Sequence, residues 1–174
     1  MKLHIRPETA AEFPAIYELN ALAFGQDNES RLVDKLRDTP FFIPELSIVA
    51  YAGEYLVGYI LLTRLPLKGD DGLTYETLAL APVSVTPALH QMGVGGQLIR
   101  HALKEASALG FDSVIVLGHP EYYPKFGFEK ASGFGIRTSY EVPDEAFMAV
   151  ELVPGALKGK AGQVAYPKAF EEVG

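Results

Sequence analysis

The chain has no cysteine, no long apolar run and no excess of basic residues. Without cysteine there are no disulfides, no thiolate metal ligands and no cysteine nucleophile. No stretch approaches the roughly 20 apolar residues of a membrane span, and the opening MKLHIRPETAAEF lacks the apolar run of a signal peptide, so we expect a cytoplasmic protein. Fifteen basic against 22 acidic side chains give a net charge of −7, which argues against a duplex nucleic acid partner.

The composition that remains is typical of a folded globular chain. Hydrophobic residues make up 48% and charged residues 21% of its 174 positions, enough to bury a sizeable core. We therefore expect a single domain over residues 1–174. The sequence leaves open whether two copies form a homodimer.

Helix signals occur before and after the glycine-rich stretch. Thr9, with Glu12 three residues later, predicts a capping box for a helix that runs to Phe24. A second amphipathic helix is expected from Asn28 or Ser30. A third follows the glycines, with apolar residues at helical spacing.

Runs rich in β-branched and aromatic residues predict the strands. Gly53-Glu54 lies between two of them at the spacing of a tight hairpin. Pro82 cannot donate a ladder hydrogen bond, so its strand should be bulged or splayed there. The order strand, glycine turn, helix, strand over residues 74–117 predicts a parallel crossover. The expected strands cover residues 2–7, 46–52, 55–65, 73–85, 113–120 and 146–153. The pattern of residues 158–174 predicts no element.

The stretch VSVTPALHQMGVGG leads from a strand through three glycines into a helix. A helix N-terminus presents unpaired N–H groups and the positive end of the helix dipole, so this turn is suited to an anion. A Walker loop requires Lys and Ser/Thr after the last glycine, and they are missing. A dinucleotide fingerprint requires a glycine where Leu98 stands and a shorter turn, so this interpretation is weak.

The run from Gln91 to Gly96 is similar to the pattern (Arg/Gln)-x-x-Gly-x-(Gly/Ala), and the whole stretch resembles the coenzyme A loop of the GNAT acyltransferase superfamily. YYPKFGF, after the next strand, is similar to the superfamily's (Phe/Leu)-Tyr-x-x-x-Gly-Phe segment. GHPEYYPKFGF, NESRLVDKLR, VPDEAFMAVELVPGAL and YPKAF resemble the YhbS-like predicted N-acetyltransferases and cover nearly the whole chain.

The resemblance implies a mixed α/β (α+β) GNAT fold. Its central sheet is mixed but mostly antiparallel, splays between the fourth and fifth strands, and is flanked by about four helices. The implied activity is transfer of an acetyl or other acyl group from acetyl-CoA to an amine acceptor by direct attack, without a metal. The alternatives are a coenzyme A or acyl-carrier binding module without turnover, and a nucleotide-binding oxidoreductase.

By resemblance, the pantetheine arm contacts the strand before the loop, and the pyrophosphate contacts the backbone amides of the loop. An asparagine that many members carry before the tyrosine is missing from VLGHPEY, so this anchoring is expected from backbone near Gly118. Arg100, Lys104 and Lys125 could meet the ribose phosphate, or could be solvated charges. The implied coenzyme-binding residues are Val83, Ser84, Val85, Gln91, Met92, Gly93, Val94, Gly95, Gly96, Gly118 and Tyr123.

Tyr123 matches the family tyrosine that protonates the leaving thiolate. A phenol with a pKa near 10 is adequate for a thiol leaving group of roughly 8 to 9. The alternative is that Tyr123 only packs against neighbouring aromatic residues. Two carboxylates are candidates for the general base: Glu76 on the strand before the loop, and Glu29 in the loop between the first two helices. The alternative for each is a solvated surface carboxylate. His119 and Glu121 are close in sequence to Tyr123 and could act in relay.

Overall fold

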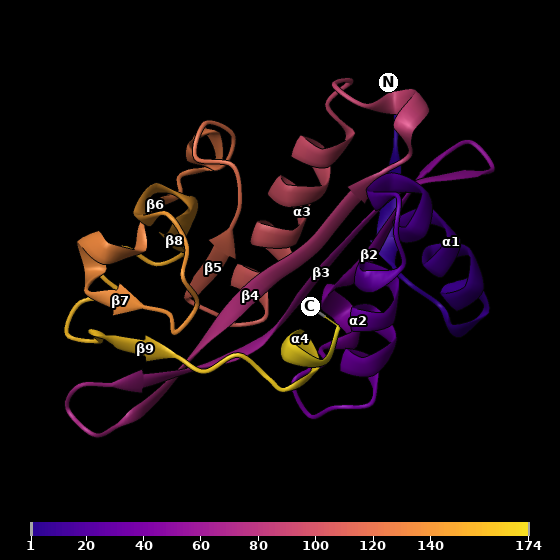
Figure 1. Cartoon of the computed structure of the whole chain (residues 1–174). Coiled ribbons are helices and arrows are strands. Elements are labelled where there is room, and N and C mark those ends of the chain that lie inside the picture. Colours follow the sequence, from indigo (N-terminus) through magenta and orange to yellow (C-terminus); the bar gives the residue numbers. More distant parts are fainter. Residues whose placement is uncertain (1, 174) are drawn as a thin grey trace. The chain divides into compact units, whose positions relative to one another are not determined.

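The computed structural model describes residues 2–173 (Figure 1). The chain divides into two compact units, each described by itself below. The first unit comprises Met1–Thr63, Ala81–Glu105 and Lys168–Gly174, and the second comprises Arg64–Leu80 and Ala106–Pro167. Strands β3 (Tyr55–Gly69) and β4 (Thr74–Val85) and helix α3 (Val94–Ala108) each contribute residues to both units.

The sheet of the first unit is an antiparallel meander. Strand β1 (His4–Pro7) pairs with β2 (Ser47–Ala52), and β2 pairs with β3. The turn between β2 and β3 is Gly53-Glu54, and Gly53 has a positive φ of 60°, so the predicted hairpin is confirmed. Side chains alternate between the faces of a strand, which leaves Tyr59 and Leu61 of β3 on one face and Gly58 on the other.

Three helices belong to the first unit besides the start of α3. Helices α1 (Phe13–Phe24) and α2 (Asn28–Arg37) lie side by side, and the short α4 (Ala169–Glu172) packs against α2 (Figure 1). Their apolar faces meet one face of β2 and β3. Full burial of each large side chain there stabilises the fold by about 1.5–3 kcal/mol. The core comprises Ile16, Leu19, Leu32, Val33, Leu36, Val49, Tyr59, Leu61, Ala169 and Val173.

The boundaries of α1 and α2 follow their caps. The capping box of Thr9 and Glu12 is present, but it begins the 3₁₀ segment Ala10–Glu12, which leads into α1. Gly25, in the left-handed conformation, ends α1. The prediction that Glu29 lies in the inter-helix loop is wrong: Glu29 is in the first turn of α2, where the Asp27 carbonyl already accepts a bond from the Arg31 N–H at 2.9 Å.

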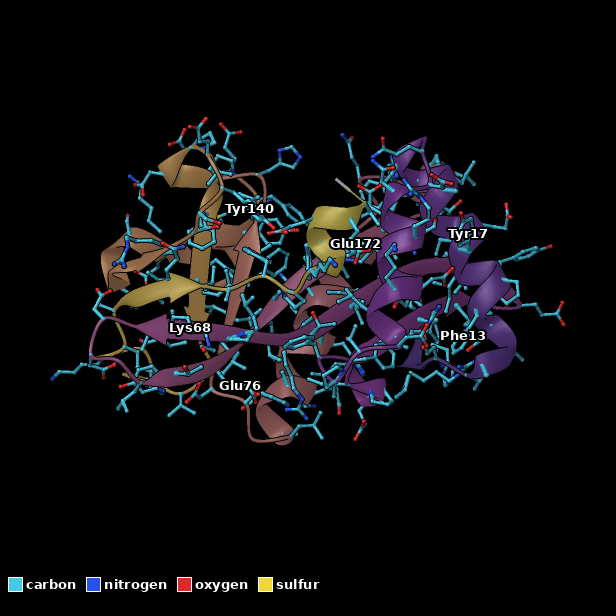
Figure 2. All side chains as sticks on the ribbon, turned by 60° about the horizontal axis from the view of Figure 1, so that its bottom comes forward. Phe13, Tyr17, Lys68, Glu76, Tyr140 and Glu172 are labelled. Carbon is cyan, nitrogen blue, oxygen red and sulfur yellow. The ribbon has the colours of Figure 1, made fainter. Side chains whose placement is uncertain are left out.

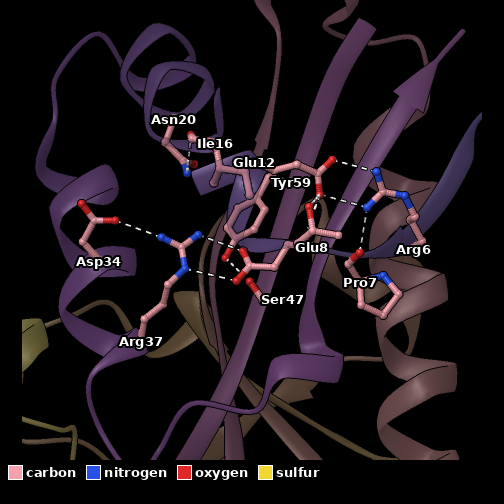
Figure 3. Close-up of polar contacts among 11 residues, drawn as sticks. Arg6, Pro7, Glu8, Glu12, Ile16, Asn20, Asp34, Arg37, Ser47 and Tyr59 are labelled. Atoms are coloured by element: carbon pink, nitrogen blue, oxygen red, sulfur yellow. Dashed lines mark hydrogen bonds and ion pairs between the residues drawn. The ribbon is translucent and has the colours of Figure 1, made fainter. Parts of the chain in front are cut away.

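Two arginine–carboxylate clusters lie beside this core (Figure 3). The Arg37 guanidinium donates two hydrogen bonds to Glu8, of 2.8 and 3.1 Å, and one to Asp34. It also lies 3.8 Å from the centre of the Phe13 ring. Arg6 donates two bonds to Glu12, at 2.7 and 2.9 Å. These contacts fix the chain between β1 and α1 to its neighbours.

The second unit contains the crossover pair. Residues of β3 and β4 form a hairpin, and β4 pairs in parallel with β5 (Ser113–Leu117) at the register position Ala79↔Ile115. Strand β8 (Phe147–Glu151) is antiparallel to β5, and β6 (Glu129–Lys130) is antiparallel to β8. The predicted parallel crossover within a mostly antiparallel mixed sheet is confirmed.

The C-terminal segment continues the structure of both units. Strand β9 (Gly162–Val164) pairs antiparallel with β3 and parallel with β7 (Ile136–Arg137), and α4 follows. This places the segment for which the sequence pattern predicted no element. Within residues 2–173, no helix is both long and apolar enough to cross a bilayer.

Candidate active site

The end of β4 and the loop after it belong to the first unit. The Thr86 N–H donates to the Val57 carbonyl at 2.8 Å, which holds the loop to β3. The His90 ring nitrogen lies 2.9 Å from the Val85 carbonyl oxygen. Val83 and Val85 are half-buried, while Ser84 is only 3% exposed and its Oγ has no hydrogen-bond partner among the described residues. The loop is therefore tied to the strands that precede it.

The glycine turn delivers the start of α3. Gln91 and Gly93 have positive φ angles of 66° and 83°, and the chain then enters the helix at Val94. The Met92 N–H donates to the Leu89 carbonyl at 3.3 Å, and the Gln97 N–H donates to the Gly93 carbonyl at 3.1 Å as the helix begins. Helix geometry leaves the earlier N–H groups without intrahelical partners, at the positive end of the dipole. The predicted glycine turn that leads into a helix is present in the first unit.

The family pattern fits this turn in a register shifted by one residue. When its two small residues are aligned with Gly93 and Gly95, its first position falls on His90 rather than Gln91. The prediction that Gln91 occupies the first position of the pattern is therefore wrong. Gln91 instead occupies the left-handed position of the turn.

Gly58 is a residue of this region that the sequence patterns did not predict. A Cβ at this position of β3 would lie 2.8 Å from Leu98 Cδ1 and 3.0 Å from Val94 Cγ1. The first turns of α3 therefore rest directly on the backbone of β3. An isolated glycine inside a strand pattern signals such a close approach, and Gly58 in YLVGYILL was that signal.

Tyr123 begins a 3₁₀ segment, Tyr123–Phe126, of the second unit. Its side chain is 7% exposed, and its ring meets those of Tyr122 and Phe128 edge to face, with centroids 5.2 and 5.6 Å apart. Burial, with a smaller contribution from Tyr122, raises the pKa of Tyr123 to about 12. The phenol is thus protonated throughout the ordinary pH range, and it is a weaker acid than an exposed tyrosine.

Gly118 directly follows β5 and contacts the Tyr123 ring. A Cβ on Gly118 would lie 2.3 Å from Tyr123 Cε2 and 2.9 Å from Cδ2. The Gly118 N–H donates to the Ala146 carbonyl at 2.9 Å. The second unit therefore brings Gly118 and Tyr123 together.

The two candidate bases have different surroundings. Glu76, on β4 of the second unit and labelled in Figure 2, is exposed. It forms an ion pair with Arg64 at 3.2 Å. Glu29, in the first unit, is half-buried and accepts a hydrogen bond from the Gln26 amide at 3.1 Å. Neither contact is with Tyr123.

The other charged candidates near Tyr123 are exposed. The His119 carbonyl accepts bonds from the N–H groups of Tyr122 and Tyr123, at 3.1 and 3.4 Å, while its side chain and that of Glu121 are exposed. Lys125 Nζ lies 5.2 Å from the centre of the Tyr122 ring. Among residues 2–173, no group of three His, Asp or Glu side chains could hold a metal ion.

A family model described as an acetyltransferase (GNAT) domain matches residues 4–131. The chain belongs to the GNAT acetyltransferase family. Two Escherichia coli (strain K12) relatives support this: the uncharacterized N-acetyltransferase YjhQ is 40% identical over 75% of the chain and 72% of its own length. The uncharacterized N-acetyltransferase YhbS is 30% identical over 95% of the chain and 97% of its own length.

Two solved GNAT structures are similar over nearly the full chain. YhbS from Escherichia coli in complex with CoA has a TM-score of 0.91 and 29% identity, covering 100% of this chain and 94% of that one. A GNAT family acetyltransferase from Brucella melitensis in complex with acetyl-CoA has a TM-score of 0.79 and 29% identity, covering 97% and 98%. The predicted family, its YhbS-like subgroup, the fold and the N-acetyltransferase class are confirmed.

Proposed function

We propose that this GNAT protein binds acetyl-CoA and transfers its acetyl group to an amine, with residues 1–174 acting as one domain. The observation that carries the proposal is the glycine turn at the N-terminus of α3, which has no acidic side chain among Gln91 to Gly96. The two related structures that hold CoA and acetyl-CoA support it. We also propose a cytoplasmic location, where this thioester is available.

The coenzyme would contact the chain mainly through backbone groups. We assign the pyrophosphate to the amides of the glycine turn and the pantetheine arm to the end of β4, with further contacts near Gly118. Backbone N–H groups at Val83 and Val85 would stabilise the oxyanion that forms on the thioester carbonyl. The full set is Val83, Ser84, Val85, Gln91, Met92, Gly93, Val94, Gly95, Gly96, Gly118 and Tyr123.

The chain contains no cysteine, so a covalent route through a thiol is closed. The proposed reaction is therefore direct attack of the amine on the thioester. The neutral amine attacks the thioester carbonyl carbon, and a tetrahedral intermediate forms. The nitrogen loses one proton to a base, for which Glu76 and Glu29 remain the candidates. The C–S bond breaks with its electron pair on sulfur, and Tyr123 donates a proton to give the free thiol. Solvent reprotonates the phenolate.

Thiol release from acetyl-CoA with a panel of amines and peptides tests this proposal. We expect turnover with at least one acceptor, and Tyr123→Phe should lower kcat on that acceptor by about 10²–10⁴-fold. The neighbouring Tyr122→Phe is the matched control. Unchanged turnover in Tyr123→Phe would remove its catalytic role.

The same assay separates the alternatives. Tight binding of coenzyme A without thiol release for any acceptor would indicate a binding module. Donors with longer acyl chains define the acyl specificity. Glu76→Gln and Glu29→Gln should identify the base, because the variant that removes it loses the acidic limb of the kcat/KM profile.

A further inference from the structure

The phenol of Tyr123 is held by a contact that depends on a missing side chain. The nearest ring atoms lie so close to Gly118 that a Cβ there would be 2.3, 2.9 and 3.3 Å from Cε2, Cδ2 and Cζ. We propose that Gly118 is a positioning residue, which sets where the Tyr123 hydroxyl lies for proton transfer to the leaving thiolate. This inference rests on the proposed function.

The ring has little freedom to move away from Gly118. It is 7% exposed and is surrounded by the rings of Tyr122, Phe126 and Phe128, with centroid distances of 5.2, 6.5 and 5.6 Å. The contact involves Cδ2 as well as Cε2, so the clash would extend along one whole edge of the ring. A larger residue at position 118 must therefore displace the whole ring.

The backbone on both sides of the contact is also fixed. The Gly118 N–H donates to Ala146 at 2.9 Å, which ties the end of β5 to the start of β8. The His119 carbonyl accepts from Tyr122 and Tyr123, at 3.1 and 3.4 Å. Gly118 and Tyr123 are thus separated by one short, hydrogen-bonded turn. Strain at position 118 would pass to the ring rather than to the chain.

The size of the displacement predicts its effect. An ordinary carbon–carbon contact begins near 3.4 Å, so a methyl group at position 118 should move the ring by about 1 Å. Proton donors act within about 2.6–3.2 Å of their acceptor, and a misplacement of this size can cost about 10²-fold in rate. The loss should appear in kcat, because the phenol acts on the leaving group after the coenzyme has bound.

The test compares Gly118→Ala with Gly133→Ala, since a Cβ on Gly133 of the same unit meets nothing within 4 Å. We expect Gly118→Ala to lower kcat by about 10–100-fold, and Gly133→Ala to change neither kcat nor KM for acetyl-CoA. Combined with Tyr123→Phe, Gly118→Ala should cost little more, because there is no hydroxyl left to misplace. An unchanged kcat, or an equal loss in the Tyr123→Phe background, would overturn the proposal.

A measurement without turnover separates this inference from the proposed function. In NMR spectra of the coenzyme-free chain, the ring resonances of Tyr123 should shift in Gly118→Ala and not in Gly133→Ala. If the wild-type chain releases no thiol from acetyl-CoA, the proposed function fails while this shift still reports the contact. If the shift is absent, the positioning role fails whatever the activity.

A second variant covers a loss of folding in Gly118→Ala. Phe128→Leu removes part of the aromatic wall around the ring and gives it room. Gly118→Ala in that background should still show a lower kcat than Phe128→Leu alone. Equal kcat values for the two would overturn the positioning role.

Discussion

The two units differ in which groups they bury. In the first unit, the Arg37–Glu8 pair has side chains only 9% and 5% exposed. In the second unit, the equally bidentate Arg137–Asp70 pair has side chains 53% and 56% exposed, and aromatic rings are packed around Tyr123 instead. The same contact between arginine and carboxylate is thus desolvated in one unit and hydrated in the other. The two pairs have similar geometry, but they should therefore contribute very different amounts to the free energy of unfolding.

Removal of the buried arginine should have the largest effect on stability. Arg37→Leu leaves the Glu8 carboxylate buried without its partner, which typically costs about 3–5 kcal/mol. It also removes the guanidinium from the Phe13 ring. Urea unfolding followed by circular dichroism measures the loss. A cost below about 1 kcal/mol would show that burial does not distinguish this pair.

A double variant checks the cause. Replacing both partners, as in Arg37→Leu with Glu8→Met, removes the uncompensated charge and should recover a large part of the lost stability. If the double variant is as unstable as Arg37→Leu alone, lost packing rather than buried charge is responsible.

The second cluster of the first unit should make stability depend on acid. Hydrogen bonding to Arg6 first, with Tyr51 and the Thr9 N–H, lowers the pKa of Glu12 to about 2. Because the folded pKa lies below the unfolded value, this stabilisation is present above about pH 4.5 and is lost as the pH falls toward 2.

Glu12→Gln isolates this contribution. The wild-type chain should lose about 1–2 kcal/mol more than the variant between pH 5 and pH 2, a value reduced because Arg6 is partly exposed. Unfolding curves across this pH range provide the measurement. Parallel pH profiles of the two chains would contradict the role of Glu12.

The exposed pair of the second unit should show the smallest effect. Arg137→Leu is expected to change the free energy of unfolding by less than about 1 kcal/mol, and salt should screen most of it. The measurement is urea unfolding at low and high ionic strength. A cost equal to that of Arg37→Leu would abolish the contrast between the units.

Much of the fold could be predicted because its signals are local. The capping box at Thr9 and the Gly53-Glu54 turn each depend on nearby residues, and each is present. Strand β9 could not be predicted: its three residues have no periodicity, and its position depends on pairing with β3, about 95 residues earlier. Glu29 was placed in a loop because the sequence does not show how early α2 begins.

The candidate site was predictable where it depends on backbone conformation. The glycines ahead of a helix predicted the turn at Gly93. The aromatic motif identified Tyr123 as a candidate residue. The buried environment of that phenol and the contact with Gly118 arise from packing, so the sequence could not predict the raised pKa. The sequence likewise could not predict the partners of Glu76 and Glu29, because these contacts depend on side-chain geometry.

Gly58 has a consequence for how coenzyme affinity could be altered. Helix α3, which follows the glycine turn, contacts Gly58 of β3 through Val94 and Leu98. Gly58 lies 36 residues before the start of this helix. A single methyl group on β3 would lift that helix and tilt its free N–H groups, without any change in the loop. The pyrophosphate site that we propose at this turn is therefore adjustable from the middle of a strand, which a mutational screen confined to loop residues would not include.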